Sequence, residues 1–226
     1  MDKKLRNYFM MSDVPRLIGI GMMAAGAILL LLAWFVPIGL FFWILMCLCL
    51  AGGPVLFWVA GSMRASESDI DEHLKRSTSD MGLSPSDESK YRKRLLSSMP
   101  PQTVSAYVYR EGLMLARSKD GTVRSEEYAK AMIYVLTDGI VIISRTISLI
   151  SDEKQDQTIE IPFASLEKAE LVSEKKQLCF GKKSFEIKES FLQIVHDGIT
   201  LQIPTQLDFK LEQFVEKLNK LVAAQN

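Results

Sequence analysis

The chain has 226 residues, of which 27 are lysine or arginine and 27 are aspartate or glutamate, so its formal net charge at pH 7 is zero. This balance excludes a strong attraction of the whole chain to nucleic acid, and three cysteines cannot build a disulfide framework. The length indicates one folded domain besides any membrane segment. No metal-ligand or cofactor-binding spacing is present, so we expect no metal and no cofactor.

Residues 1–16 carry four basic side chains, Lys3, Lys4, Arg6 and Arg16, ahead of a long apolar stretch. A secretory signal peptide begins in the same way, but its apolar core has only about 7–15 residues and ends at a small-residue cleavage site. Neither feature is found here. We therefore interpret residues 1–16 as an N-terminal segment on the cytoplasmic side.

Residues 17–63 contain no Asp, Glu, Lys, Arg or His. The stretch is longer than the roughly 20 apolar residues that one helix needs to cross a bilayer. Pro37 and Gly39 lie near its middle and would break one long helix into two. We predict a transmembrane hairpin with helices over residues 17–35 and 40–60.

The positive charge on both sides of this hairpin predicts its orientation. Basic residues precede the first helix and follow the second, whereas the turn has none. Both termini should therefore face the cytoplasm, in a multi-pass protein of the plasma membrane.

Small residues at similar depth predict the contact between the two helices: Gly19, Gly21 and Ala25 in the first, and Ala51, Gly52 and Gly53 in the second. Gly21 and Ala25 form a small-xxx-small pair, which makes them the main candidates in the first helix. The alternative is a broken helix at residues 52–54 that lines a transport site. We disfavour it because no ionisable residue lies at that depth.

Residues 64–101 are rich in serine and charged side chains, as expected of a solvated linker with short helices. Ser66 or Ser68 could cap a first short helix. Ser84 predicts the cap of a second one, because Pro85 follows at the first helical position and Asp87 at the third.

A basic run lies at the end of this second helix, with Lys90, Arg92, Lys93 and Arg94. Near a cytoplasmic leaflet such a run could bind anionic lipid, at about 1 kcal/mol per charge. The alternative is that these side chains lie in water while Leu95 packs on the next domain.

The pattern of residues 102–226 predicts a cytoplasmic domain built of short strands. Asp-Gly occurs at residues 120–121, 138–139 and 197–198, and each pair predicts a hairpin turn. The predicted strands are 104–117, 123–128, 134–137, 140–143, 158–162, 169–172, 178–187, 191–195 and 199–203.

The last segment has helical periodicity. Thr205 and Asp208 have the spacing of a capping box, and Glu216 and Lys220 that of an i,i+4 ion pair. The apolar stripe consists of Leu207, Leu211, Phe214, Val215, Leu218 and Val222, with Phe209 as an exception on the opposite side. We predict an α+β fold in which this helix closes the open end of a bent antiparallel sheet.

The order of these elements resembles a known family. Residues 134–138 precede an Ile/Val strand, Ile161-Pro162-Phe163 leads through Leu166 into residues 169–172, and a hairpin and a terminal helix follow. This succession, over about residues 123–224, resembles the PH/GRAM-like domains of bacterial membrane proteins. The resemblance implies a partly open barrel of two bent sheets plugged by the last helix, and a binding module without a named ligand.

Basic residues beside the predicted turns are the candidates for binding a lipid headgroup: Lys119 and Arg124 at the first turn, or Lys182 and Lys183 further on. Paired lysines are usually solvated loop residues, which is the alternative for the second pair. The chain has two histidines, and none of the common hydrolase, nucleotide-binding or zinc-protease motifs occurs. We therefore expect no catalytic residue.

These patterns predict a membrane-tethered PH-like binding or scaffolding module that recruits a partner protein or a lipid headgroup at the inner leaflet. The alternative is an accessory subunit of a transport or secretion complex, assembled or self-associated through the hairpin. An enzyme would require a cleft with perturbed acidic groups.

Overall fold

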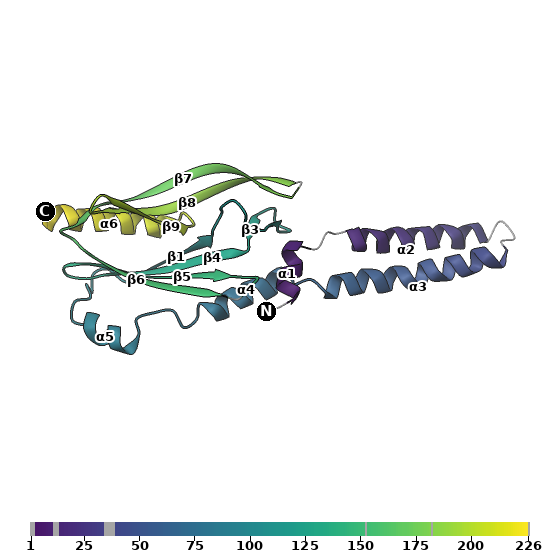
Figure 1. Cartoon of the computed structure of the whole chain (residues 1–226), viewed down its shortest axis with the longest axis horizontal. Coiled ribbons are helices and arrows are strands. Elements are labelled where there is room, and N and C mark those ends of the chain that lie inside the picture. Colours follow the sequence, from purple (N-terminus) through teal and green to yellow (C-terminus); the bar gives the residue numbers. More distant parts are fainter. Residues whose placement is uncertain (1–2, 11–13, 34–38, 152, 182, 226) are drawn as a thin grey trace. The chain divides into compact units, whose positions relative to one another are not determined.

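The computed structural model describes residues 3–10, 14–33, 39–151, 153–181 and 183–225 of the chain (Figure 1). It is a mixed α+β structure with two compact units, one ending at Asp69 and one beginning at Ile70. The first unit is helical. The second contains the sheets. Part of the predicted linker therefore belongs to the folded unit that carries the sheets.

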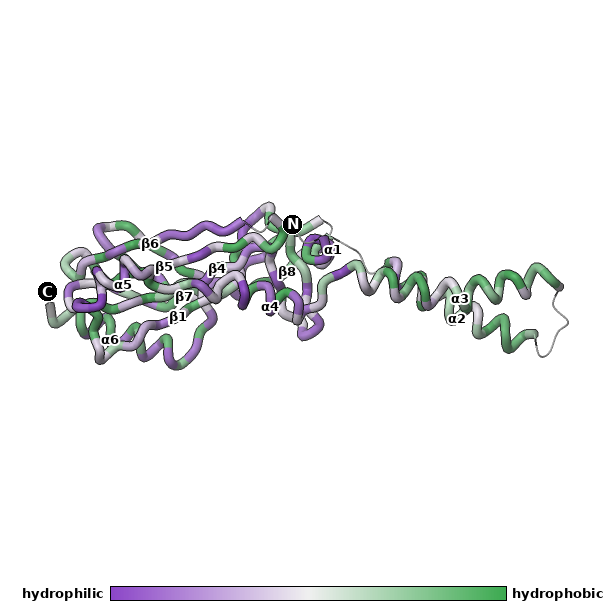
Figure 2. The backbone as a smooth tube through the Cα atoms, turned by 90° about the horizontal axis from the view of Figure 1, so that it is seen from below, coloured by the Kyte–Doolittle hydropathy of each residue, from purple (hydrophilic) through white to green (hydrophobic). Residues whose placement is uncertain are grey.

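The helical unit contains α1 (Lys3–Met10), α2 (Val14–Ala33), α3 (Leu40–Ser62) and the start of α4 (Glu67–Ser77). By length and composition, α2 and α3 are apolar enough to cross a membrane, and their strongly hydrophobic colouring is visible in Figure 2. The predicted break at Pro37 lies outside the described residues.

Glycines mediate the contact between α2 and α3. A Cβ atom added at Gly19 would lie 2.9 Å from the carbonyl oxygen of Gly53, and one added at Gly26 would lie 2.9 Å from the side chain of Leu50. From Gly19 to Gly26 the contact advances along α2, whereas it moves back along α3 from Gly53 to Leu50. The helices are thus antiparallel, and their backbones approach closely.

This contact includes the predicted Gly19 but corrects the predicted pair Gly21 and Ala25. A Cβ atom at Gly21 would meet nothing within 4 Å, and Ala25 is exposed. In α3, Gly53 lies in the contact, while Gly52 lies beside Met22. The predicted pair Gly21 and Ala25 lies on the wrong face of α2, because small residues occur on both faces of this helix.

The second unit contains a four-stranded antiparallel sheet in the order β1-β4-β5-β6 and a three-stranded one in the order β7-β8-β9. A small hairpin, β2-β3, is separate from both. The bounds are β1 Gln102–Tyr107, β2 Leu115–Arg117, β3 Val123–Ser125, β4 Glu127–Val135, β5 Gly139–Ser148, β6 Lys154–Pro162, β7 Leu166–Phe180, β8 Lys183–His196 and β9 Ile199–Thr205. The described strands form no closed barrel.

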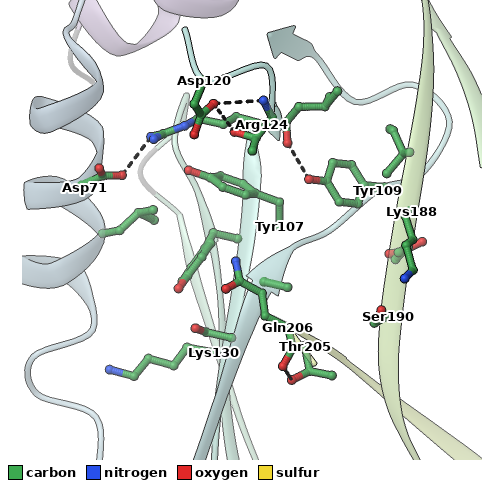
Figure 3. Close-up of a pocket in the computed structure, with 18 of the residues that line it drawn as sticks. Asp71, Tyr107, Tyr109, Asp120, Arg124, Lys130, Lys188, Ser190, Thr205 and Gln206 are labelled. Atoms are coloured by element: carbon green, nitrogen blue, oxygen red, sulfur yellow. Dashed lines mark hydrogen bonds and ion pairs between the residues drawn. The ribbon is translucent and has the colours of Figure 1, made fainter. Parts of the chain in front are cut away.

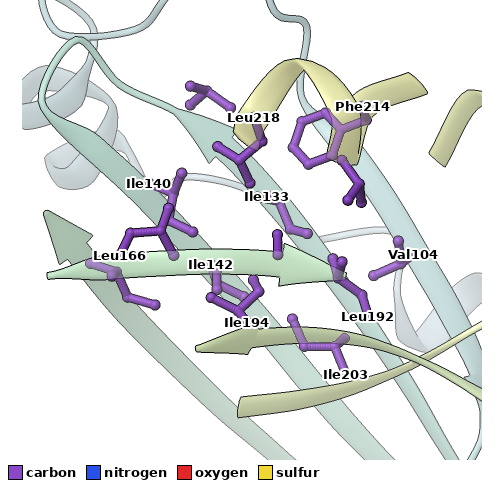
Figure 4. Close-up of a cluster of buried hydrophobic side chains, with 14 of the residues drawn as sticks. Val104, Ile133, Ile140, Ile142, Leu166, Leu192, Ile194, Ile203, Phe214 and Leu218 are labelled. Atoms are coloured by element: carbon purple, nitrogen blue, oxygen red, sulfur yellow. The ribbon is translucent and has the colours of Figure 1, made fainter. Parts of the chain in front are cut away.

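The hydrophobic core lies between the two sheets and α6 (Phe209–Gln225), as Figure 4 shows. The four-stranded sheet contributes Ile133 and Ile142, and the three-stranded sheet contributes Leu192 and Ile194. Of the predicted helical stripe, Leu211, Phe214, Val215, Leu218 and Val222 are buried. Leu207 and Phe209 are exposed.

The three Asp-Gly pairs lie where one strand connects to the next, as predicted, but Gly139 is already the first residue of β5 and the physical reasons differ. Asp197 and Gly198 have φ angles of +48° and +71°, which suit a two-residue hairpin turn. At the start of β5, Gly139 is required because a Cβ atom would collide with the backbone carbonyl oxygen of Ile161.

The strand predicted over residues 178–187 is wrong. β7 ends at Phe180 and β8 begins at Lys183, with Gly181 at a φ of +60° between them. The apolar pattern continues on both sides of Gly181, which made two arms of a hairpin look like one strand. The predicted strand over residues 104–117 is likewise interrupted between β1 and β2.

Serine and aspartate cap the helices. Ser66 caps α4, because its Oγ accepts a hydrogen bond from the backbone N–H of Asp69 at 3.1 Å. Ser84 does the same for α5 (Pro85–Tyr91), as predicted. The cap of α6 is Asp208 and not Thr205: the Asp208 carboxylate accepts from the N–H of Leu211 at 2.6 Å, while Thr205 is still the buried last residue of β9.

Candidate functional site

A pocket of about 880 Å³ lies entirely within the second unit (Figure 3). Its lining comes from α4, β1, the β2-β3 hairpin, β4, β8 and the end of β9. We call it the edge groove, because it lies where strand edges lack a partner strand.

The edge groove exists because β9 is shorter than β8. β9 ends at Thr205, which is paired with Ser190, so β8 from Lys183 to Glu189 has β7 on one side and no described strand on the other. Likewise β1 is paired only with β4 among the described strands. The free edge of β7 differs, since the Asn219 side chain of α6 forms hydrogen bonds of 2.7 and 2.9 Å with the backbone of Ala169.

Three tyrosines give the edge groove an aromatic wall. Tyr107 and Tyr128 lie opposite each other on β1 and β4, with ring centroids 5.3 Å apart in an edge-to-face arrangement. The Tyr109 hydroxyl donates to the carbonyl oxygen of Val123 at 2.6 Å. Burial, and secondarily the charge of Glu189, raises the pKa of Tyr109 to about 12, so this hydroxyl is neutral at physiological pH.

Arg124, a predicted headgroup-binding residue, lies in the edge groove and already has a partner. Its guanidinium forms an ion pair of 2.8 Å with Asp71 of α4 and also lies 6.0 Å from the centre of the Tyr107 ring. Figure 3 shows this pair linking the helix to the β2-β3 hairpin. Arg124 therefore connects two parts of the groove wall.

The other acidic side chains of the lining are also engaged. Asp120 accepts hydrogen bonds from the N–H and hydroxyl of Thr122, which lower the pKa of this carboxyl. The buried Glu189 forms an ion pair of 2.7 Å with Lys176, and Glu186 lies 3.9 Å from Lys175. Asp71, Glu186 and Glu189 thus have basic partners, whereas Asp120 keeps its negative charge beside the neutral Thr122.

Three lysines of the lining have no acidic partner among the described residues: Lys75 of α4, Lys130 of β4 and Lys188 of β8. The Lys130 ammonium lies 3.3 Å from the hydroxyl of Thr78, to which it donates. The lining contains four basic and four acidic side chains, so its formal charge is balanced, and these three lysines are its basic residues without an ion pair among the described residues.

The basic run at the end of α5 is not a single lipid-facing cluster. Lys90 and Arg94 form ion pairs of 2.9 and 2.8 Å with Glu160 of β6, and Arg94 forms another of 2.8 Å with Asp138. Hydrogen bonding from Lys90, with smaller contributions from Arg94 and Tyr91, lowers the pKa of Glu160 to about 2. Arg92 and Lys93 are exposed and are the two members of the predicted run without an ion pair among the described residues.

These ion pairs hold the segment after α5 against the four-stranded sheet. Tyr91 is buried, and its hydroxyl donates to Glu160 at 2.9 Å. Leu95 forms a β-bridge with Leu136, so the alternative in which Leu95 packs on the domain describes this segment better.

The remaining predicted lysines are not part of the edge groove. Lys119 lies beside the β2-β3 turn but does not line the edge groove. Lys183 is the first residue of β8, and Lys182 lies outside the described residues. Sequence analysis missed Lys75, Lys130 and Lys188 because they come from three separate elements. No local spacing joins them.

The described part of the chain contains no group of three or more His, Cys, Asp or Glu side chains that could hold a metal ion. No family model matches the chain, and the comparisons find no similar curated protein and no similar solved structure. The edge groove is thus a polar and aromatic cleft between open strand edges, with three lysines that have no ion pair among the described residues, and it is suited to binding.

Proposed function

We propose that this chain is a membrane-held, PH-like module that recruits a partner protein through the edge groove. The observation that carries the proposal is the pair of unpaired strand edges, β1 and the first half of β8, that border the groove. Open strand edges offer backbone donors and acceptors to an extended segment of another protein.

The membrane location is supported by α2 and α3, which are long and apolar enough to cross a bilayer. Basic residues precede α2 and follow α3, so the positive-inside rule favours a two-pass anchor with both termini in the cytoplasm. Such an anchor would present the second unit at the inner leaflet of a plasma membrane.

The PH-like assignment is supported by the order of elements. Four antiparallel strands form one sheet, three form a second sheet, and a C-terminal helix packs on the core between them. The β2-β3 hairpin would then be an insertion after the first strand. A fold of this kind hosts many ligands, so the partner has to be inferred from the site.

A protein partner fits the site better than a lipid headgroup, and binding fits it better than catalysis. Three of the predicted headgroup-binding cations already have acidic partners, with Arg124 on Asp71 and both Lys90 and Arg94 on Glu160. The carboxylates of the edge groove are engaged in ion pairs or in a turn, which leaves no acid–base pair for chemistry.

Photo-crosslinking in native membranes tests this function. A crosslinking amino acid replaces Thr103, an exposed residue of β1 that lines the edge groove, and as a control replaces Lys217 on the exposed side of α6. We expect one discrete crosslinked protein from position 103 and none from position 217. The same weak pattern from both positions would refute the proposal.

A second function, an accessory subunit assembled through the hairpin, is favoured by one observation. Gly21 faces away from α3 and has nothing within 4 Å of its Cβ position, which would let another helix approach α2. A crosslinker at the exposed Ile28 would distinguish the two functions, since a discrete product from position 28 but not from position 103 supports the accessory subunit.

A further inference from the structure

We propose that the occupant of the edge groove is an extended acidic segment of the partner protein, which lies along the free edge of β8 as a continuation of β9. This inference rests on the proposed function and adds the chemistry of the partner. It follows from the register of β8, from the alternation of its side chains and from the three lysines of the lining that have no ion pair among the described residues.

The register shows where a strand is missing. Thr205 pairs with Ser190, and the chain then turns into α6, whose cap is Asp208, so β9 itself cannot continue. The free edge from Lys183 to Glu189 is roughly 20 Å long at about 3.3 Å per residue. A guest segment that continued the line of β9 would run antiparallel to β8 and use its unpaired backbone groups.

The side chains along this edge define what the guest must present. Phe185 and Ile187 are buried and pack with Leu115 of the β2-β3 hairpin, whereas Glu186 and Lys188 are exposed. A strand paired with β8 therefore has alternate side chains on an apolar and on a charged side. The aromatic wall around Tyr109 can accept the apolar ones.

Three lysines of the groove lining indicate which charge the guest segment should carry. Lys75, Lys130 and Lys188 have no acidic partner among the described residues, although they line one cleft. In Figure 3, Lys130 extends toward α4, whereas Lys188 lies on the opposite side of the groove on β8. Lysines that flank a cleft fit carboxylates spaced along a chain, while a single phosphate would require them to converge.

Fluorescence anisotropy with the full chain in detergent micelles tests the proposal. The probe is a labelled, end-capped peptide of about ten residues that alternates valine with glutamate. One matched control has lysine in place of glutamate, and another is N-methylated along its backbone. We expect saturable binding of the acidic peptide, at least about tenfold weaker binding of both controls, and weaker binding at high salt.

Charge-reversal variants tie binding to the edge groove. Lys188→Glu and Lys75→Glu each change an exposed residue of the lining, and Lys217→Glu is the matched control on α6. We expect about a fivefold loss of affinity for the acidic peptide in each groove variant and no change in the control. The double groove variant should bind the lysine peptide better than the unchanged protein does.

Hydrogen exchange separates strand addition from simple charge attraction. Bound acidic peptide should slow amide exchange within residues 183–189 of β8, and the N-methylated peptide should not. Binding without this protection would overturn the proposal. So would a preference for vesicles that contain phosphorylated inositol lipids, lost in Lys188→Glu, together with no binding of the acidic peptide.

The crosslinking experiment distinguishes failure of this inference from failure of the proposed function. If the crosslink from position 103 persists in the double variant Lys75→Glu/Lys188→Glu, the groove recruits a partner whose binding does not depend on these lysines. This inference is then wrong. If position 103 gives no discrete crosslink in the otherwise unchanged chain, the proposed function itself is wrong.

Discussion

Arg145 and Asp156 are joined by two parallel hydrogen bonds across β5 and β6, with Nε to Oδ1 at 2.6 Å and Nη2 to Oδ2 at 2.7 Å. The remaining Nη1 of Arg145 donates to the carbonyl oxygen of Ser77 at 2.9 Å and to the carboxylate of Asp80. One buried guanidinium thus fixes the end of α4, which is one wall of the edge groove, to the four-stranded sheet.

Replacement of Arg145 by methionine should destabilise the second unit by about 2–4 kcal/mol, because a buried carbonyl and two carboxylates lose their donor. The measurement is the free energy of unfolding of the full chain by pulse proteolysis, with hydrogen exchange of residues 70–80 as a local readout. The control is Arg76→Met. Arg76 pairs with Glu72 in the exposed part of α4, and its loss should cost less than about 0.5 kcal/mol. Equal effects of the two substitutions would contradict the role of Arg145.

The pKa of Glu160 predicts a pH dependence of the segment after α5. Lys90, Arg94 and Tyr91 hold this pKa at about 2, below the ordinary 4.5, so the charged form is favoured in the folded state. The stability that it contributes is complete above about pH 4.5 and is lost as the pH falls toward 2. Thermal unfolding of the unchanged chain and of Glu160→Gln should therefore differ at pH 7 and converge near pH 2. A difference that stayed constant across this range would exclude the ion pairs as its cause.

Two phenylalanines of α6 provide a matched test of the core. Phe214→Ala should cost about 3–5 kcal/mol, because the ring is buried between the two sheets. Phe209→Ala should change the free energy of unfolding by less than about 0.5 kcal/mol, because Phe209 is 71% exposed. The two values come from chemical denaturation of the full chain in detergent. A large cost at Phe209 would mean that it packs against a surface in solution.

Two glycines of α2 provide the corresponding test of the hairpin. Gly19→Ala should weaken the contact between α2 and α3 by about 1–3 kcal/mol, because the added methyl group would meet the backbone of Gly53. Gly21→Ala should be neutral or slightly stabilising, because its Cβ position is open and alanine favours a helix. Unfolding of the hairpin in sodium dodecyl sulfate, followed by energy transfer between labels on the two helices, measures both. The reverse order would restore the contact that was predicted through Gly21.

Much of the fold could be predicted because its signals are local. Ser66 and Ser84 cap helices through side chains that lie only three residues from their partners. The Asp-Gly pairs set turns, and the apolar period of residues 211–222 predicts which face of α6 is buried. Each of these features depends on neighbours along the chain.

The edge groove could not be predicted because it depends on where strands end relative to each other. Thr205 looked like a helix cap, yet it is the last residue of β9, and its pairing with Ser190 leaves the rest of β8 unpaired. The gathering of lysines without an ion pair in one groove has the same origin. Lys130 and Lys188 lie far apart in the sequence, and the engagement of Asp71 by Arg124 is visible only in three dimensions.

The bare flank of β8 also bears on solubility. A strand with one vacant side is a template on which a second copy can add, and repeated addition leads to fibrils. Exposed charges at Lys183, Glu186 and Lys188 disfavour such stacking between molecules that a bilayer would concentrate. Removal of these charges should therefore increase aggregation even where the fold stays intact.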